Sequence, residues 1–354
     1  MVQNKAFIYK KIPNGLPIPG EDVTVEDIGF DENALPPKNG FSMKNLYASY
    51  DPGQRRQLRD PAIPSYSAAL KPGRPVVSVS VIGQVLESDR PNIKKGALVT
   101  VQNCSTEEYS IVPESLAKDA QLIEPKDSIP LTAYLGVLGI KGLTAYGSLR
   151  EIARPKKGET ILISAAAGAV GQIVGQICVR EGLRVSIRVI GSVGDDSKLE
   201  FITKELRFTS GFNYKKEKMA DALKRLAPDG LDIYFDNVGD ELLDTVLWDM
   251  KTFGRIVASG TISTYNSSDS NPILGVKSYS KIVRRRLKWE GFLVYDQNIQ
   301  QWGKQRDEDV FRWIANGELK SVEHITEGIE NAAEGFVGML KGDLGKSILK
   351  ITKS

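Results

Sequence analysis

Short apolar runs separated by turn residues dominate the first third of the chain. β-branched residues cluster at 76–86, 97–101 and 108–112, and Gly, Pro, Asn and Asp punctuate the gaps between these runs. Repeated prolines between positions 36 and 75 exclude long helices there, since proline breaks the interior of a helix. This pattern predicts a β-rich first domain.

From about residue 132 the pattern changes to helices alternating with strands, which is typical of a parallel sheet covered on both faces. Strands are predicted at 160–163, 184–190, 232–235, 255–259 and 289–294, and helices at 169–181, 198–205, 216–226 and 241–250. Helices at 305–316 and 329–341 and a closing strand at 346–351 follow. We expect an α/β protein of two domains, one spanning 132–304 and the other 1–131 completed by 305–354, because the closing strand would pair with the first domain.

Length and composition agree with a two-domain globular enzyme. A chain of 354 residues is longer than a single hydrophobic core usually supports, so two domains are expected. Its fractions of hydrophobic residues, 41%, and of charged residues, 26%, are close to the average for globular proteins. A net charge of +3 spread along the chain gives no basic patch of the kind that binds nucleic acid. The densest basic run, Arg284 to Arg286 with Lys288, is interpreted as a solvated helix end.

The sequence predicts a cytoplasmic protein that does not enter a membrane. The amino terminus interleaves lysines with apolar residues and lacks the apolar core of a signal peptide, and two distant cysteines give no disulfide framework. The nearly uncharged segment 161–179 has the length of a membrane span, but three glycines interrupt it. A buried strand leading into a buried helix explains that segment better.

The most informative motif is the strand at 160–163 followed by a small-residue turn and a helix. Gly168 and Gly171 let a pyrophosphate approach backbone N–H groups at the helix amino terminus, where the helix dipole favours negative charge. Gly175 would let the helix pack closely on the sheet. A plain packing turn is the alternative, but strand, turn and helix in this order favour a dinucleotide site.

The end of the second strand distinguishes NADH from NADPH. A carboxylate there would accept from the ribose hydroxyls and repel a 2′-phosphate, and we expect none, because the small residues Gly191, Ser192, Val193 and Gly194 follow the predicted strand. Lys198 lies one helical turn further on. This arrangement predicts NADPH, although an ordinary exposed lysine also fits position 198.

No metal site is predicted, and a tyrosine is the candidate acid. Two cysteines and one histidine, His324, are too few for the usual zinc sites, so zinc-assisted alcohol oxidation is excluded and His324 is assigned a surface or packing role. Tyr265 follows the strand at 255–259 and would lie at the carboxyl edge of the sheet, where open α/β folds bind ligands. The alternative for Tyr265 is a loop side chain that packs on its neighbours.

Several stretches, taken together, resemble the zinc-free alkenal double-bond reductase and prostaglandin reductase branch of the medium-chain dehydrogenase/reductase superfamily. The resemblance spans nearly the whole chain, and its glycine turn is shared across the superfamily while the tyrosine loop and GLTAYGSL are more specific to the branch. The stretches are NLYASYDP (45–52), GIKGLTAYGSL (139–149), PKKGETILISAAAGAVGQIVGQ (155–176), FDNVG (235–239), GRIVASGTISTYN (254–266) and EGFLV (290–294).

The resemblance implies a GroES-like β-rich catalytic domain joined to a Rossmann domain, an active site in the cleft between them, and a homodimer. It further implies that Lys198 and Tyr214 contact the adenosine 2′-phosphate, that Asn237 lies near the cofactor, and that Tyr265 is the acid or orients the enolate. With the strand-end residues, the expected cofactor-binding set is Ala167, Gly168, Ala169, Val170, Gly171, Gly191, Ser192, Lys198, Tyr214, Asn237 and Tyr265.

Three positions depart from the pattern of that branch. Gly53 follows Asp51 and Pro52 where many members carry an aromatic residue, which opens the expected pocket wall. Asp343 stands where an asparagine touching the cofactor is common, and the predicted second strand, 185–190, is about three residues longer than usual.

These observations predict an NADPH-dependent reductase of the carbon–carbon double bond in α,β-unsaturated aldehydes and ketones. A quinone reductase shares the cofactor domain and the lack of zinc and is the nearest alternative. A protein that binds NADPH without turnover and serves a structural or interaction role is a second alternative, motivated by Gly53.

Overall fold

The computed structural model describes residues 1–126, 129–268 and 273–352, which fold into two compact units. The β-rich unit comprises residues 1–135 and 323–354, and the α/β unit comprises residues 136–322. The sequence pattern instead predicts residues 305–322 in the first domain. They join the α/β unit because Arg306 Nη1 donates to the Gly139 carbonyl at 2.6 Å and the Trp313 ring lies 6.2 Å from that of Tyr146.

The β-rich unit holds two sheets, one of three strands in the order β2-β1-β4 and one of seven strands. Its elements are β1 (Lys5–Tyr9), β2 (Val23–Asp27), β3 (Phe41–Ser49), α1 (Gly53–Gln57), β4 (Arg74–Pro75), β5 (Val77–Ser88), β6 (Leu98–Ser105), β7 (Tyr109–Val112), α2 (Glu114–Ala117), β8 (Gln121–Leu122), a 3-10 turn (Leu131–Leu135), β15 (Glu323–Glu327), a second 3-10 turn (Ile329–Asn331), α11 (Ala332–Lys341) and β16 (Lys346–Lys350).

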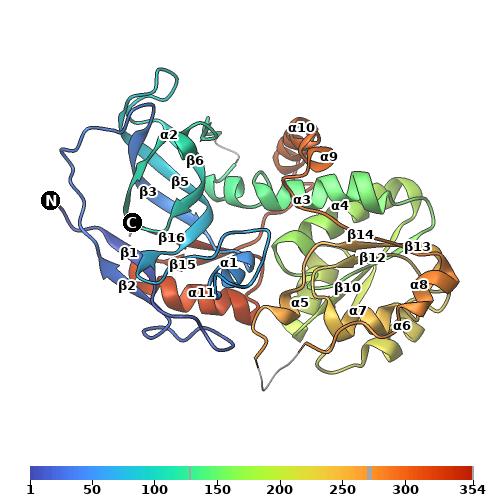
Figure 1. Cartoon of the computed structure of the whole chain (residues 1–354). Coiled ribbons are helices and arrows are strands. Elements are labelled where there is room, and N and C mark those ends of the chain that lie inside the picture. The colour runs from blue at the N-terminus through green and yellow to red at the C-terminus, as the bar shows by residue number, and fades with distance from the viewer. Residues whose placement is uncertain (127–128, 269–272, 353–354) are drawn as a thin grey trace. The chain divides into compact units, whose positions relative to one another are not determined.

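The closing strand of the chain lies inside the larger sheet (Figure 1). That sheet has the order β15-β16-β3-β5-β6-β8, with β7 also paired to β3, and β16 runs antiparallel to β3. The predicted pairing of the closing strand with the first domain is therefore confirmed. Phe336 on α11 and Leu349 on β16 are fully buried and complete a core with Phe7 and Phe41.

The α/β unit is built on one six-stranded parallel sheet in the order β11-β10-β9-β12-β13-β14. Its elements are α3 (Ile140–Ser148), a π-helical turn (Leu149–Ala153), β9 (Thr160–Ile163), α4 (Ala169–Val185), β10 (Arg188–Val193), α5 (Asp196–Glu200), a second π-helical turn (Phe201–Glu205), β11 (Ser210–Asn213), α6 (Met219–Leu226), β12 (Leu231–Asp236), α7 (Asp240–Val246), β13 (Met250–Ala258), a 3-10 turn (Ile262–Thr264), α8 (Ser280–Arg285), β14 (Lys288–Gly291), α9 (Gln297–Gln300) and α10 (Gly303–Ala315).

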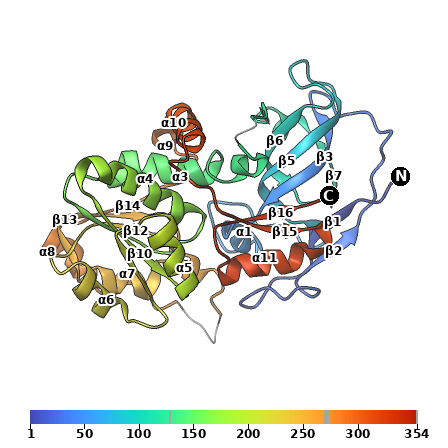
Figure 2. The same ribbon diagram turned by 180° about the vertical axis from the view of Figure 1, so that it is seen from behind.

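Helices cover both faces of this sheet. Helices α3 and α4 lie on one face, and α6 and α7 lie on the other, as the two opposite views show (Figures 1 and 2). Buried side chains of α6 and α7, such as Leu223 and Val246, pack with Leu162, Tyr234 and Ile256 of the sheet. This doubly covered parallel sheet is the arrangement that the alternating pattern predicts.

The second strand begins later than predicted, and this shift affects the site. Helix α4 does not stop at Gly182 but continues to Val185, and Ser186 ends it in the left-handed conformation with φ of 56°. A Cβ on Gly182 would lie 3.1 Å from the Ile187 carbonyl oxygen, so Gly182 admits the returning chain instead of ending the helix. The strand therefore covers 188–193, and the prediction of 184–190 is wrong at both ends.

The segment with the length of a membrane span is the buried strand β9, its turn and the start of α4, as predicted. Among the residues that the structure describes, none of the helices is long and apolar enough to cross a membrane.

Candidate functional site

The glycine turn joins β9 to α4 at the carboxyl edge of the sheet. Gly168 is the N-cap of α4, and the helix begins at Ala169. A Cβ on Gly171 would lie 2.4 Å from the Ala165 carbonyl oxygen, closer than real Cβ contacts come, so only glycine fits there. The turn therefore leaves backbone N–H groups uncovered at the start of a 17-residue helix, the arrangement that binds a phosphate group.

Gly175 also has a steric role, but its neighbour differs from the predicted one. A Cβ on Gly175 would lie 1.8 Å from Cζ of Phe208, a buried ring just before β11. The glycine thus lets this aromatic ring pack against α4, in place of the close helix-to-sheet contact that the sequence suggested.

Two predicted cofactor residues, Gly191 and Ser192, lie inside β10 and beneath the turn. The Ala166 N–H donates to the Ser192 carbonyl at 3.1 Å, and a Cβ on Gly191 would lie 2.8 Å from that of Ala166. Ser192 is 1% exposed. Both residues support the turn from below, so they hold its shape and do not present a side chain to solvent.

The residues that follow β10 bring Lys198 and Tyr214 to one place. Strand β10 ends at Val193, whose carbonyl accepts from the Tyr214 N–H at 3.0 Å. A Cβ on Gly194 would lie 2.8 Å from the Tyr214 hydroxyl, and Lys198 lies in the first turn of α5. Lys198 and Tyr214 therefore both lie near the end of β10, and their contact with a 2′-phosphate stays a prediction.

The same strand end carries carboxylates, so the prediction that none stands there is wrong. Asp195 and Asp196 directly follow Gly194, and they escaped notice because the strand was placed too early. Asp195 forms an ion pair with Lys198, with 2.9 Å between Oδ2 and Nζ. Partial burial raises the pKa of Asp195, but hydrogen bonds from the Lys198 N–H, from Ser197 and from the Lys198 ammonium outweigh it and lower the pKa to about 2.

Asn237 is held at the end of β12 by groups that sequence reasoning missed. Its N–H donates to Ser164 Oγ at 2.9 Å, and its Nδ2 donates to the Ser164 carbonyl at 2.7 Å. The buried carboxylate of Asp236 accepts from the N–H groups of Val238 and Gly239 and from the Tyr234 hydroxyl, all within 3.0 Å. Burial raises the pKa of Asp236, while these hydrogen bonds oppose the rise.

These contacts fix the side of the site opposite Lys198. Ser164 directly follows β9 and Asp236 ends β12, so their positions at strand ends were the signal that could have marked them. Because open parallel sheets bind ligands at this edge, polar residues that end their strands are candidates even without a motif.

The loop with Tyr265 packs against the Asn237 turn. The Ile262 N–H donates to the Asn237 carbonyl at 3.3 Å, and Ser263 Oγ donates to the Val238 carbonyl at 2.5 Å. Ile262 and Ser263 both belong to a short 3-10 turn, Ile262–Thr264, and the N–H of the half-buried Tyr265 donates to the Ile262 carbonyl at 3.2 Å. Tyr265 and Asn237 therefore belong to adjoining loops at the carboxyl edge of one sheet.

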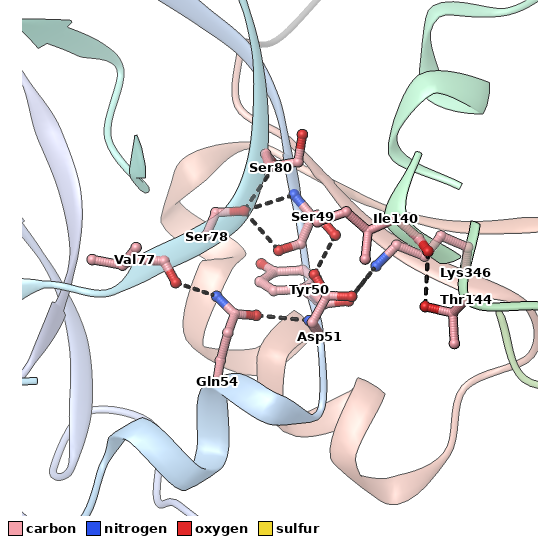
Figure 3. A network of polar contacts seen from close by, with 10 residues as sticks. All are labelled: Ser49, Tyr50, Asp51, Gln54, Val77, Ser78, Ser80, Ile140, Thr144 and Lys346. Atoms are coloured by element: carbon pink, nitrogen blue, oxygen red, sulfur yellow. Dashed lines mark hydrogen bonds and ion pairs between the residues drawn. The ribbon is translucent and has the colours of Figure 1, made fainter. Parts of the chain in front are cut away.

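In the β-rich unit, a buried polar network follows β3 (Figure 3). Lys346 and Asp51 are each 2% exposed at the side chain and form an ion pair with 3.1 Å between Nζ and Oδ1. Lys346 also donates to the Tyr50 carbonyl, and Ser49 Oγ donates to the other Asp51 oxygen at 2.5 Å. The Asp51 N–H donates to Gln54 Oε1 at 2.7 Å.

This network fixes the chain just before Gly53, which begins α1. The nearest group to a Cβ placed on Gly53 is the Tyr66 hydroxyl, 3.9 Å away. Tyr66, and not an aromatic residue at position 53 itself, therefore borders the space beside this glycine. Asp343, another of the three departures, faces His324, with 3.7 Å between Oδ2 and Nε2.

The described part of the chain has no group of three or more His, Cys, Asp or Glu side chains placed to hold a metal ion. Cys104 and Cys178 are both buried, one in β6 and the other in α4, and burial raises the pKa of each thiol, that of Cys104 to about 12.

A β-rich unit combined with a doubly covered parallel sheet and a glycine turn at its carboxyl edge defines the two-domain dinucleotide-binding class of proteins. Family models agree with this division: residues 5–119 match the N-terminal domain of oxidoreductase, and residues 169–307 match a family described as zinc-binding dehydrogenase. The chain belongs to the medium-chain dehydrogenase/reductase family, in the branch of NADP-dependent oxidoreductases.

Two relatives cover nearly the full length of the chain. The NADP-dependent oxidoreductase RED1 of Cochliobolus heterostrophus is 44% identical over 99% of this chain and 98% of its own. The NADP(+)-dependent 2-alkenal reductase of Nicotiana tabacum is 38% identical over the same shares.

Solved structures share the fold. CurA from Vibrio vulnificus, crystallised with NADPH, is 28% identical with a TM-score of 0.86 and covers 99% of this chain and 100% of its own. The quinone oxidoreductase of Escherichia coli, also with NADPH, is 20% identical with a TM-score of 0.72, over 98% and 99% of the two chains, which shows the fold alone.

Proposed function

We propose that the α/β unit binds NADPH and that the protein reduces the carbon–carbon double bond of α,β-unsaturated aldehydes and ketones. The observation that carries the proposal is the turn at 164–171, where a Cβ on Gly171 would collide with the Ala165 carbonyl at 2.4 Å. This backbone cradle suits a pyrophosphate, and the relatives named for NADP and for alkenal reduction support the same assignment.

The residues at the strand ends would each hold one part of the dinucleotide. Backbone N–H groups of 167–171 would bind the pyrophosphate, Lys198 and Tyr214 would bind the 2′-phosphate, and Asn237 would border the nicotinamide side. The bound cofactor supplies a hydride to the β-carbon of the substrate.

Tyr265 is proposed as the acid that completes the reduction. As the β-carbon receives hydride, negative charge grows on the carbonyl oxygen, and a phenol can donate a hydrogen bond to it or a proton to the α-carbon. Tyr265→Phe should lower kcat about 100-fold, within the range for loss of one positioned acid, while the Kd for NADPH stays nearly unchanged. An unchanged kcat would remove Tyr265 from this role.

Lys198→Ala tests the cofactor assignment. The variant should lose on the order of tenfold to 100-fold in affinity for NADPH, because a charge-assisted contact to the 2′-phosphate disappears, and much less in affinity for NADH. Binding measured by titration calorimetry gives both values, and equal losses for the two dinucleotides would contradict the assignment.

The substrate class is tested by NADPH consumption across alkenals, enones and quinones, followed by identification of the product. Preferential turnover of quinones would assign the chain to the quinone reductases, whose fold it shares. NADPH binding without turnover of any substrate would favour a structural or interaction role instead.

We also propose a homodimer formed through β14, the edge strand of the parallel sheet. Lys288 and Glu290 flank Trp289, which is 41% exposed, and antiparallel pairing about Trp289 would place each Lys288 opposite the partner's Glu290. Lys288→Glu should therefore favour the monomer, and Lys288→Glu combined with Glu290→Lys should restore the dimer. Light scattering after size-exclusion chromatography measures this, and a monomeric wild-type protein would refute the proposal.

A further inference from the structure

The strand end that would receive the 2′-phosphate carries balanced charge and is not a purely cationic pocket. Asp195 pairs with Lys198 at 2.9 Å, and Asp196 pairs with Lys216 and accepts from Asn213 Nδ2 at 2.8 Å. Lys198 and Lys216 thus each have a carboxylate within contact distance. A ligand phosphate that binds Lys198 is therefore also repelled by the negative charge of Asp195.

Asp195 is also fixed in place, so it cannot easily turn away from a ligand. It is the N-cap of α5, and its Oδ1 accepts from the Lys198 N–H at 2.8 Å and from Ser197 Oγ at 2.7 Å. Its other oxygen holds the Lys198 ammonium. Rotation of the carboxylate away from the strand end would leave the first turn of α5 without its cap, which disfavours such a rotation.

The two nicotinamide dinucleotides would experience this carboxylate differently. A 2′-phosphate carries close to two negative charges. It must therefore share the Lys198 ammonium with Asp195, and the Asp195 carboxylate repels it. A ribose 2′-hydroxyl has no charge and can donate a hydrogen bond to a carboxylate at the end of the second strand. The same residue thus weakens binding of the phosphorylated form and favours the unphosphorylated form.

We propose that Asp195 is a cofactor-specificity residue that reduces the preference of this protein for NADPH over NADH, so that both dinucleotides are used. The inference rests on the proposed function, because it assumes that the dinucleotide occupies this edge of the sheet. Lys198 supplies the preference for the phosphate, and Asp195 limits how large that preference becomes.

The carboxylate can be removed without losing the cap. Asparagine is as good an N-cap as aspartate and has nearly the same shape, and serine is a second capping residue without charge. Asp195→Asn and Asp195→Ser therefore isolate the charge, and thermal melts of both variants report whether α5 is intact. Glu200→Gln is the matched control, because it removes one negative charge from the same helix, where Glu200 pairs with the exposed Lys204.

Binding of cofactor fragments gives a readout that does not depend on turnover. Titration calorimetry compares adenosine 2′,5′-bisphosphate with adenosine 5′-monophosphate, and NADPH with NADH, for each variant. Both Asp195 variants should raise the ratio of affinities in favour of the 2′-phosphorylated ligand by roughly tenfold, the effect of removing one like charge from a few ångströms away. Glu200→Gln should change the ratio less than twofold.

A double variant sharpens the test. Lys198→Ala removes the cation that pairs with the Asp195 carboxylate. This single variant should therefore lower the affinity for NADPH more than the double variant Asp195→Asn/Lys198→Ala does. The inference fails if the Asp195 variants change the ratio no more than Glu200→Gln does, or if wild-type protein already excludes NADH. Failure of the wild-type protein to bind either dinucleotide would instead contradict the proposed function.

Discussion

The buried Lys346–Asp51 pair offers the sharpest test of how the β-rich unit is held together. Lys346 and Asp51 lie 295 positions apart in sequence, each is 2% exposed at the side chain, and 3.1 Å separates Nζ from Oδ1. Lys346→Met keeps most of the apolar stem but leaves the Asp51 carboxylate buried without its counter-ion. Breaking a buried pair from one side costs about 3–5 kcal/mol, a large share of the 5–15 kcal/mol that stabilises a typical domain.

Urea denaturation of the full chain measures this loss. All four tryptophans lie between positions 248 and 313, in the α/β unit, so their fluorescence follows that unit, while far-ultraviolet circular dichroism also follows the strands of the β-rich unit. Lys346→Met should lower the dichroism midpoint. Lys350→Met is the matched control on the same strand, because Lys350 pairs with the largely exposed Glu327 at 3.2 Å and should cost less than about 1 kcal/mol.

The double variant Asp51→Asn/Lys346→Met separates a buried-charge effect from lost packing. It removes both charges, so it should recover at least about half of the stability lost in Lys346→Met, as replacement of a whole buried pair is often neutral. The reasoning is refuted if Lys346→Met lies within about 0.5 kcal/mol of wild type, or if the double variant is no more stable than the single one.

Two further substitutions test the turn and the core. Gly171→Ala should abolish measurable NADPH binding by calorimetry, because its Cβ must displace the Ala165 carbonyl, and retained binding would contradict the cradle. Burial raises the pKa of Glu107 to about 7, against a hydrogen bond from Ser110 that lowers it. This carboxyl therefore stabilises the fold below its unfolded pKa of about 4.5 and loses that contribution, about 3 kcal/mol, as pH rises through 7. Glu107→Gln should flatten the urea stability profile over this window, and an unaltered slope would count against the assignment.

Local patterns predicted the glycine turn between β9 and α4 well, because its signal is contained in consecutive residues. Strand β9 and the start of α4 fall where the apolar run and the glycines place them. Tyr265 was located by a rule of the fold, since loops after parallel strands meet at one edge. The resemblance added Lys198, Tyr214 and Asn237, whose positions depend on several strands together.

The predictions were wrong where contacts between residues distant in sequence set the bounds or the pairing of an element. Gly182 is typical of a helix end, yet here it allows a close approach of Ile187. The second strand was therefore predicted too early in the sequence, and Asp195 at its true end was overlooked. Strand β11, Ser210–Asn213, was missed because its four residues contain neither a β-branched residue nor an apolar alternation. The Lys346–Asp51 pair had no local signal, since only the pairing of β16 with β3 brings the two residues together.

The central place of β16 bears on the order in which the chain folds during synthesis. A ribosome synthesises the whole of residues 136–322 before it reaches the strand that pairs with both β3 and β15. The α/β sheet can therefore form on the nascent chain, whereas the strands made first keep an open edge at β3 until β16 has been synthesised. Any truncation before β16 should accordingly leave β3 without this partner, however much of the α/β unit has been made.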